Sequence, residues 1–402
     1  MLRAMDSLRS AASSPPQITG WAPLALGFRP FFLLAAIAAV VLMVLWPAVW
    51  HGHLGSASYY PAVAWHGHEM LFGYAAAVIA GFLLTAVRNW TGMPTWTGPR
   101  LGLLALVWLL GRVLPWLPGV PAVLILVVDV AFLPLVAISL FGPLWHGQNR
   151  ANRVFVPLLV VMGVANLLSH LQLAGLAEGL GDPRRVMLDL VLMVIVIVAG
   201  RVLPFFTQNV VPGFRAKTRA RVEQASFLTL GLIAFLELVP VLPAGVTGLL
   251  WLVFGAVQVA RLSGWFDARV FRIPVLWVLH VGYAWLCLGA LLTGLSLFGL
   301  FPPPAALHAI TVGGVGVFTL GMMARVARGH TGRPIDVPRA VAAAFVLANV
   351  AAVIRVFGPA LLPGQYALWV DSSVGLWVVS FGIFAWQYLP MLLRPRADGK
   401  PG

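Results

Sequence analysis

The sequence predicts an all-α, polytopic membrane protein with about twelve transmembrane helices. Hydrophobic residues make up 60% of its 402 residues and charged residues only 9%, against about 45–50% and 25% in a typical soluble domain. So few charges cannot cover a water-soluble fold of this length, so lipid must face most of the surface. Long apolar runs, separated by clusters of proline, glycine and charge, supply the individual spans.

Each span is recognised as a run of about twenty apolar residues, the length that crosses a bilayer core of about 30 Å. The sequence contains twelve such runs between polar breaks. They lie at 28–50, 64–87, 99–117, 120–141, 154–174, 186–206, 222–240, 246–262, 273–298, 305–327, 338–357 and 366–391.

Positive charge lies on one side of the predicted bundle. The chain has 26 lysines and arginines against 12 acidic residues, a net charge of +14. In a soluble protein this balance suggests nucleic acid, but here the positive residues flank the spans, and the positive-inside rule explains them. We therefore expect a bacterial inner-membrane protein in contact with the lipid bilayer, with no nucleic-acid partner and with cytoplasmic tails at 1–20 and 395–402. The 21–394 segment forms one transmembrane domain.

Other classes of protein are disfavoured by simple features of the chain. No apolar segment precedes Trp21, so no cleavable signal peptide is expected. The single cysteine, Cys287, excludes an intramolecular disulfide framework and a cysteine-cluster metal site.

An internal repeat relates two distant spans. Residues 68–94 align without gaps on residues 308–334, and seven of the 27 positions are identical, including His68 with His308 and Gly73 with Gly313. The simplest account is three parallel four-helix units, about 21–145, 146–262 and 263–394, around a pseudo-threefold axis. The alternative is chance similarity in a sequence of low complexity.

Six of the nine histidines are expected at the outer face of the membrane. Imidazole is the commonest metal ligand in proteins, and polar groups inside a helix bundle are usually functional. The alternative is that these side chains sit half hydrated at the interface. The six candidate metal ligands are His51, His53, His66, His68, His170 and His308.

His68 and His308 form the sharpest pair, because the repeat places them at equivalent depth on equivalent spans. Two imidazoles from facing helices are the axial ligands that a b-type haem needs. His66 should face elsewhere, since residues i and i+2 of a helix point about 200° apart. It is assigned instead to a second site with His51, His53 or His170, where three histidines would suit copper.

Charged residues near the spans add candidates for supporting roles. Glu69 follows His68 directly and is a tentative catalytic residue that could orient a ligand or carry protons. Arg325, near the inner face, could hold a haem propionate or could mark the cytoplasmic boundary. Four more carboxylates fall within predicted spans, where proton relay, ligand support and helix–helix hydrogen bonding are all open. These are Asp129, Asp189, Glu237 and Asp371.

Several motifs, taken together, make the chain resemble the NnrS family. They are Gly-Phe-Arg-Pro-Phe-Phe-Leu at 27–33, Trp-His-Gly-His-Glu-Met-Leu-Phe-Gly at 65–73, Asn-Trp-Thr-Gly at 89–92, Gly-Arg-Val-Leu-Pro-Phe-Phe-Thr-Gln-Asn at 200–209, Trp-Val-Leu-His-Val-Gly-Tyr at 277–283, the segment from 308 to 333, and the tail at 396–402. These segments extend over almost the whole chain.

The resemblance implies an inner-membrane protein that contains haem b and copper and is tied to nitric oxide metabolism and protection from nitrosative stress. It also implies metal ligands among the histidines of the second, fifth, ninth and tenth spans, which adds His280 to the candidates. Nitric oxide would be the small ligand, with an unidentified electron donor. Whether the protein is an enzyme, an oxidoreductase acting on nitric oxide, stays open. A secondary transporter and a haem or metal carrier are the alternative functions.

By architecture alone, the chain is also similar to the catalytic subunit of haem–copper oxidases and nitric oxide reductases, which bind haem through their second and tenth helices. The sixth and seventh spans, which supply copper ligands there, contain no histidine here. Any copper site in this chain must therefore be built differently.

Overall fold

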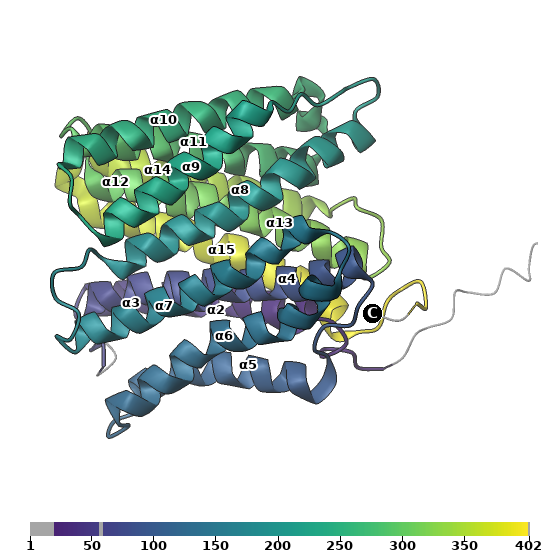
Figure 1. Cartoon of the computed structure of the whole chain (residues 1–402), viewed down its shortest axis with the longest axis horizontal. Helices are drawn as coiled ribbons and strands as arrows, with labels where there is room; N and C mark the ends of the chain where they lie inside the picture. The colour runs from purple at the N-terminus through teal and green to yellow at the C-terminus, as the bar shows by residue number, and fades with distance from the viewer. Residues whose placement is uncertain (1–19, 56–58, 401–402) are drawn as a thin grey trace, which may run out of the picture.

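The computed structural model describes residues 20–55 and 59–400, and these residues form twelve helical crossings without a strand (Figure 1). Most crossings are single helices, and two are assembled from an α-helix, a π-helix and a second α-helix. In chain order they are α2 (Phe28–Trp50); α3 (Ala62–His68) with π-helix η1 (Glu69–Ala75) and α4 (Ala76–Thr91); α5 (Gly98–Val113); α6 (Ala122–His146); α7 (Phe155–Leu173); α8 (Pro183–Val210); α9 (Ala220–Leu238); α10 (Ala244–Trp265); α11 (Pro274–Leu297); α12 (Pro303–His308) with π-helix η5 (Ala309–Val317) and α13 (Phe318–His330); α14 (Arg339–Leu361); and α15 (Tyr366–Leu393).

The predicted fold class is confirmed. Eleven of the described crossings are long and apolar enough to span a membrane, so the chain is a multi-pass membrane protein. The remaining one, α9, has 19 residues and carries Arg221, Glu223 and Glu237. Short 3-10 turns lie in the connections, namely η2 (Leu114–Trp116), η3 (Arg150–Val154), η4 (Ala268–Arg272) and η6 (Pro363–Gln365).

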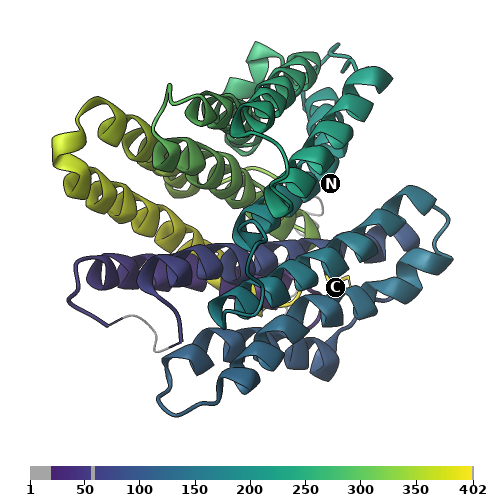
Figure 2. The same ribbon diagram turned by 60° about the vertical axis from the view of Figure 1, so that its left-hand side comes forward.

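Four crossings form the interior of the bundle, and the others surround them. The most apolar windows of Ala62–Thr91, Pro183–Val210, Pro274–Leu297 and Pro303–His330 are 72–83% buried, whereas the other seven candidate spans are 33–44% buried. The second crossing of each expected four-helix unit is therefore an inner helix. Figure 2 shows outer pairs on different sides of this interior, with α14 and α15 at the left and α5 and α6 at the bottom.

The two copies of the internal repeat have the same local construction. In each, an α-helix ends at the histidine, a π-helix follows, and an α-helix completes the crossing. Each crossing is followed by a glycine in the left-handed region, Gly92 with φ +69° and Gly332 with φ +70°, a conformation that glycine adopts without steric cost. Single π turns inside α-helices are rare and frequently lie at functional sites, which directs attention to the segments after His68 and His308.

Close backbone contacts between inner helices depend on glycine. A Cβ added to Gly282 on α11 would lie 2.7 Å from the backbone nitrogen of Phe318 and 2.8 Å from its Cα. Neither atom can move without shifting α13. Small residues that let helix backbones approach are a general feature of membrane bundles.

The substitution Gly282→Ala is therefore expected to lower stability by about 1–3 kcal/mol, the usual cost of overpacking. Gly231→Ala on α9 is the matched control, because nothing lies within 4 Å of its added Cβ and alanine favours a helix by up to about 1 kcal/mol over glycine. Thermal unfolding of the purified protein in detergent measures both. A Gly282→Ala protein that melts at or above the wild-type temperature would show that the α11–α13 contact is looser than described.

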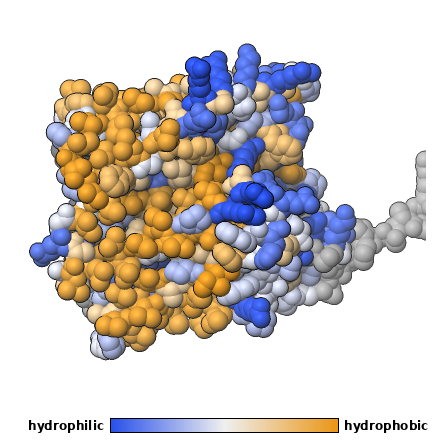
Figure 3. Space-filling model, viewed as in Figure 1, coloured by the Kyte–Doolittle hydropathy of each residue, from blue (hydrophilic) through white to orange (hydrophobic). Residues whose placement is uncertain are grey.

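Polar side chains gather at one end of the bundle, where the described C-terminal segment also lies (Figures 1 and 3). This arginine-rich end contains the loops after α4, α6, α8, α10 and α13. The C-terminal segment is attached there, because Arg396 donates to the His330 carbonyl at 3.0 Å and the Ala397 amide donates to the Thr331 carbonyl at 2.9 Å. Of the predicted N-terminal tail, residues 1–19 lie outside the described part of the chain.

Candidate metal centre

Three side chains with metal-binding atoms converge near the opposite, arginine-poor end. His68 is the last residue of α3, Asp129 is the eighth residue of α6, and His170 lies three residues before the end of α7. Each is therefore within about two turns, or roughly 11 Å, of that end of its helix. All three are buried, and their ligand atoms lie within 4.8 Å of one another.

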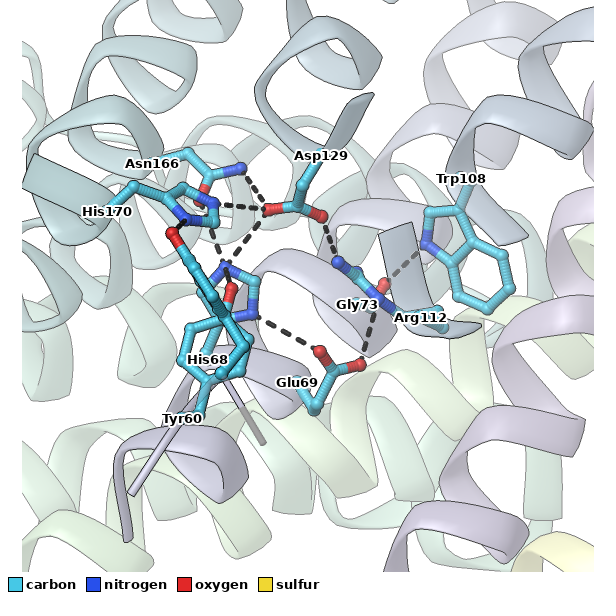
Figure 4. A network of polar contacts seen from close by, with 10 residues as sticks. Tyr60, His68, Glu69, Gly73, Trp108, Arg112, Asp129, Asn166 and His170 are labelled. Atoms are coloured by element: carbon cyan, nitrogen blue, oxygen red, sulfur yellow. Dashed lines mark hydrogen bonds and ion pairs between the residues drawn. The ribbon is translucent and has the colours of Figure 1, made fainter. Parts of the chain in front are cut away.

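One carboxylate oxygen joins the two imidazoles. Asp129 Oδ2 lies 3.1 Å from His68 Nε2 and 3.1 Å from His170 Nε2 (Figure 4). Asn166 completes the contact, since its amide nitrogen donates to the same oxygen at 2.8 Å and its carbonyl oxygen lies 3.1 Å from His68 Nε2. Two imidazoles and one carboxylate form a donor set used by iron, copper and zinc in proteins.

A buried arginine holds the acidic side of the cluster. Arg112, from α5, pairs with Glu69 Oε2 at 2.9 Å through Nε and with Asp129 Oδ1 through Nη2. Glu69 also lies 3.3 Å from His68 Nδ1. Arg112 therefore fixes the carboxylate that contacts both imidazoles, and Glu69 orients His68 through its other nitrogen, as carboxylate partners of metal-bound histidines commonly do.

The π-helix makes room for this arginine. Gly73, in η1, leaves only enough space for Arg112 and Glu69, since an added Cβ would lie 3.0 Å from Arg112 Nη1 and 3.1 Å from Glu69 Oε2. The Gly73 carbonyl accepts a hydrogen bond of 3.0 Å from Trp108 Nε1. The irregular turn of η1 thus packs α5 against the helix that carries His68.

The cluster has an unbalanced charge if its imidazoles are neutral. Glu69 and Asp129 contribute two negative charges, and Arg112 contributes one positive charge. A buried net charge is costly unless a counter-ion balances it. One further cation, either a metal ion or a proton on an imidazole, therefore suits the space between these residues.

Two tyrosines cover the cluster. The Tyr60 ring stacks on His68 with centroids 4.8 Å apart, and its hydroxyl lies 3.3 Å from His68 Nε2. The Tyr59 hydroxyl lies 2.9 Å from His170 Nδ1. Burial raises the pKa of Tyr60 and of Tyr59, with the nearby Asp129 charge adding to the shift. Both phenols are therefore neutral near pH 7, and their hydroxyls can donate.

The structure does not bring His68 and His308 together. The described contacts of His68 are with Tyr60, Glu69, Asn166 and the residues of the cluster. His308 instead turns Nδ1 back to the Pro304 carbonyl at 2.6 Å, and Arg355 and His66 are its nearby titratable neighbours. His66 faces away from His68 and stacks on Trp46 with centroids 4.3 Å apart.

The remaining predicted site residues lie apart from the cluster. His51 and His53 are exposed, with centroids 6.1 Å apart, and His51 pairs with Asp371 at 3.0 Å. His280 is buried on α11, where Nε2 lies 3.2 Å from the Thr207 hydroxyl and Nδ1 lies 3.0 Å from the Leu276 carbonyl. Arg325 lies over the Phe206 ring at 3.5 Å. Of the six candidate metal ligands, His68 and His170 are the two that the described structure joins through a shared carboxylate oxygen, that of Asp129.

The model of the NnrS protein family matches residues 22–396, nearly the whole chain. The chain belongs to the NnrS family. No curated protein matches it.

The haem that NnrS resemblance implies does not fit between these histidines. Asp129 Oδ2 contacts Nε2 of both His68 and His170, so a porphyrin plane between the two rings would have to displace the carboxylate. With His308 elsewhere, the predicted axial pair is not assembled. The donor set fits a single metal ion instead.

Part of this site is absent from the residues that the sequence indicates. Arg112, Asn166 and Tyr60 are not among the sequence-predicted candidates, and Asp129 is one only as a carboxylate within a span. The available signal was Arg112 itself, an ionisable residue within an apolar segment, which implies a partner and a function. No periodicity in the sequence relates Asn166 or Tyr60 to His68, because they meet only through packing of α7 and of the segment before α3.

Proposed function

We propose that the chain is a bacterial inner-membrane metalloprotein that binds copper at His68, Asp129 and His170 and, through it, binds or turns over nitric oxide. The observation that carries the proposal is the shared contact of two imidazoles with one buried carboxylate oxygen. With neutral imidazoles, the two carboxylates of the cluster outnumber its one arginine. Family membership supports it, because resemblance to NnrS implies copper and nitric oxide. Copper suits this donor set, because imidazole is a common copper ligand and nitrogen and oxygen ligands bind Cu²⁺ tightly.

The proposed orientation puts this site near the periplasmic surface. The loops of the arginine-rich end face the cytoplasm under the positive-inside rule, and the described C-terminal segment lies with them. His68, Asp129 and His170 then lie about two turns below the outer surface, where a small apolar gas reaches them from lipid or from water.

The surrounding residues have distinct roles in the proposed site. Arg112 keeps Asp129 ionised and aimed at the imidazoles, and Glu69 accepts from His68 Nδ1 so that Nε2 is available as a ligand. A bound copper ion would supply one-electron chemistry and an open coordination position for a gas. The Tyr60 ring covers His68 and would keep bulk water away from the metal ion. Its hydroxyl, close to His68 Nε2, could donate a hydrogen bond to a gas bound there.

Metal analysis of the protein purified in lipid nanodiscs tests this function. We expect about one copper ion per chain after copper-replete expression, and an electron paramagnetic resonance spectrum that changes when nitric oxide is added. If the protein retains copper but its spectrum does not respond to nitric oxide, the proposed metal site stands and the proposed binding of nitric oxide is wrong. If the protein retains no transition metal, both the metal site and the binding of nitric oxide through it are wrong.

A further inference from the structure

A second polar cluster lies on the other side of the arginine-poor end and takes no part in the metal centre. Asp189, the seventh residue of α8, is 1% exposed, and Glu237 is the residue before the last of α9. Both carboxyl groups line the same cavity, one from each helix. The Trp251 indole from α10 donates to Glu237 Oε1 at 3.2 Å.

Asp189 has no hydrogen-bond partner that would explain its burial. Neither of its two carboxyl oxygens is hydrogen-bonded within the described structure. A carboxyl group placed in an apolar bundle without a donor is costly. Such a side chain indicates that a ligand, water or proton completes the site.

The two carboxyl groups line a cavity of about 180 Å³ at the arginine-poor end. A water molecule occupies about 30 Å³ in the liquid, so the cavity has room for several. It reaches the surface, because its wall includes the exposed Arg185 near the start of α8 and Pro303 at the start of α12. Hydroxyls of Thr293 and Ser296, from α11, provide further polar groups along its wall.

Charge balance at this site requires a proton. Among the described residues of the cavity wall, Arg185 is the only cationic side chain, and it is exposed to solvent. Asp182, near Glu237, is paired with Arg184 at 2.9 Å and so leaves the charge balance of the two carboxyl groups unchanged. The parts of α10, α11, α12 and η5 in the wall contribute no charged residue. Two adjoining carboxylates in a poorly solvated site cannot both ionise, and such pairs hold one proton between them.

We infer that Asp189 and Glu237 form a proton-binding site that exchanges with water at the arginine-poor face of the membrane. The proton enters through the cavity and forms an O–H bond with one carboxyl group, which donates to the carboxylate of the other. On release, the O–H bond breaks and the proton returns to water. This site is independent of the metal centre and of the proposed reaction with nitric oxide.

Labelling with dicyclohexylcarbodiimide tests the site, because this reagent adds to protonated carboxyl groups in apolar surroundings. The full-length protein in nanodiscs is treated over a range of pH, and adducts are located by peptide mass spectrometry. We expect an adduct at Asp189 or Glu237 near neutral pH. Above the midpoint, labelling should decrease about tenfold for each pH unit, as the protonated fraction does.

Glu223 is the internal control, because it lies in the same helix as Glu237 but is paired with Arg261 at 2.7 Å. We expect no adduct at Glu223 near neutral pH. Asp189→Asn should remove the adduct at position 189. The variant should still elute from a size-exclusion column at the wild-type volume, which shows that it is folded. Absence of an adduct at both positions, labelling that does not depend on pH, or protection by excess sodium ions would each overturn the proposal, the last by showing a metal-cation site.

Discussion

Replacing His170 with alanine is expected to abolish tight binding of the proposed copper ion while the protein stays inserted and folded. His170 contributes one of two imidazole nitrogens, and its Nε2 contacts the Asp129 carboxylate directly. Loss of a residue that merely supports a metal ligand lowers affinity by about 10–100-fold, so loss of a ligand should lower it by more than about 100-fold. Competition with a chelator of known affinity, followed by metal analysis, gives the constant.

The matched control is His146→Ala. His146 is exposed at the arginine-rich end of α6, where Nδ1 contacts only the Gly142 carbonyl of its own helix. It should leave metal content unchanged, and His308→Ala should also do so, because His308 belongs to a different set of contacts. A His170→Ala protein with wild-type metal affinity would remove this residue from the site.

The second large effect is expected from Arg112→Met. The methionine fills a similar volume but leaves Glu69 and Asp129 as two buried carboxylates with no guanidinium between them. Breaking a buried ion pair by removing one partner lowers stability by about 3–5 kcal/mol. Arg112 forms ion pairs with two carboxylates, so both pairs are lost. We expect the unfolding temperature and the yield of folded protein to fall sharply.

Two variants distinguish this charge effect from simple loss of packing. Arg184→Ala removes a partly exposed arginine paired with Asp182 and should cost no more than about 1 kcal/mol. Adding Glu69→Gln to Arg112→Met removes one uncompensated charge and should restore part of the lost stability. If the double variant is no more stable than Arg112→Met alone, the arginine acts through packing rather than through charge.

The crossings were predictable because the bilayer imposes their length and composition. Runs such as 28–50 and 366–391 match α2 (Phe28–Trp50) and α15 (Tyr366–Leu393) closely, since apolar length alone determines a span. The repeat also predicted that the segments after His68 and His308 would be built alike, as the two π-helices are. Sequence periodicity could not predict the π turns themselves, because they alter the helix without changing its apolar pattern.

The partners of the histidines could not be predicted in the same way. The repeat places His68 and His308 at equivalent positions along their crossings, but their surroundings differ: His68 faces α6 and α7, whereas His308 turns to its own helix. Helical spacing did indicate that His66 would face away from His68. It could not indicate that Asp129 would join His170, because that contact depends on how α6 packs against α7.

The most direct test of the metal centre is pulsed electron paramagnetic resonance of the copper-loaded wild-type protein, which counts the imidazole nitrogens coupled to the Cu²⁺ spin. Two coupled imidazoles are predicted, from His68 and His170. One should be lost in His170→Ala loaded with enough copper to offset its lower affinity, and none in His308→Ala. A spectrum without imidazole coupling, or one that loses coupling in His308→Ala but not in His170→Ala, would contradict the assignment of these residues as the ligands.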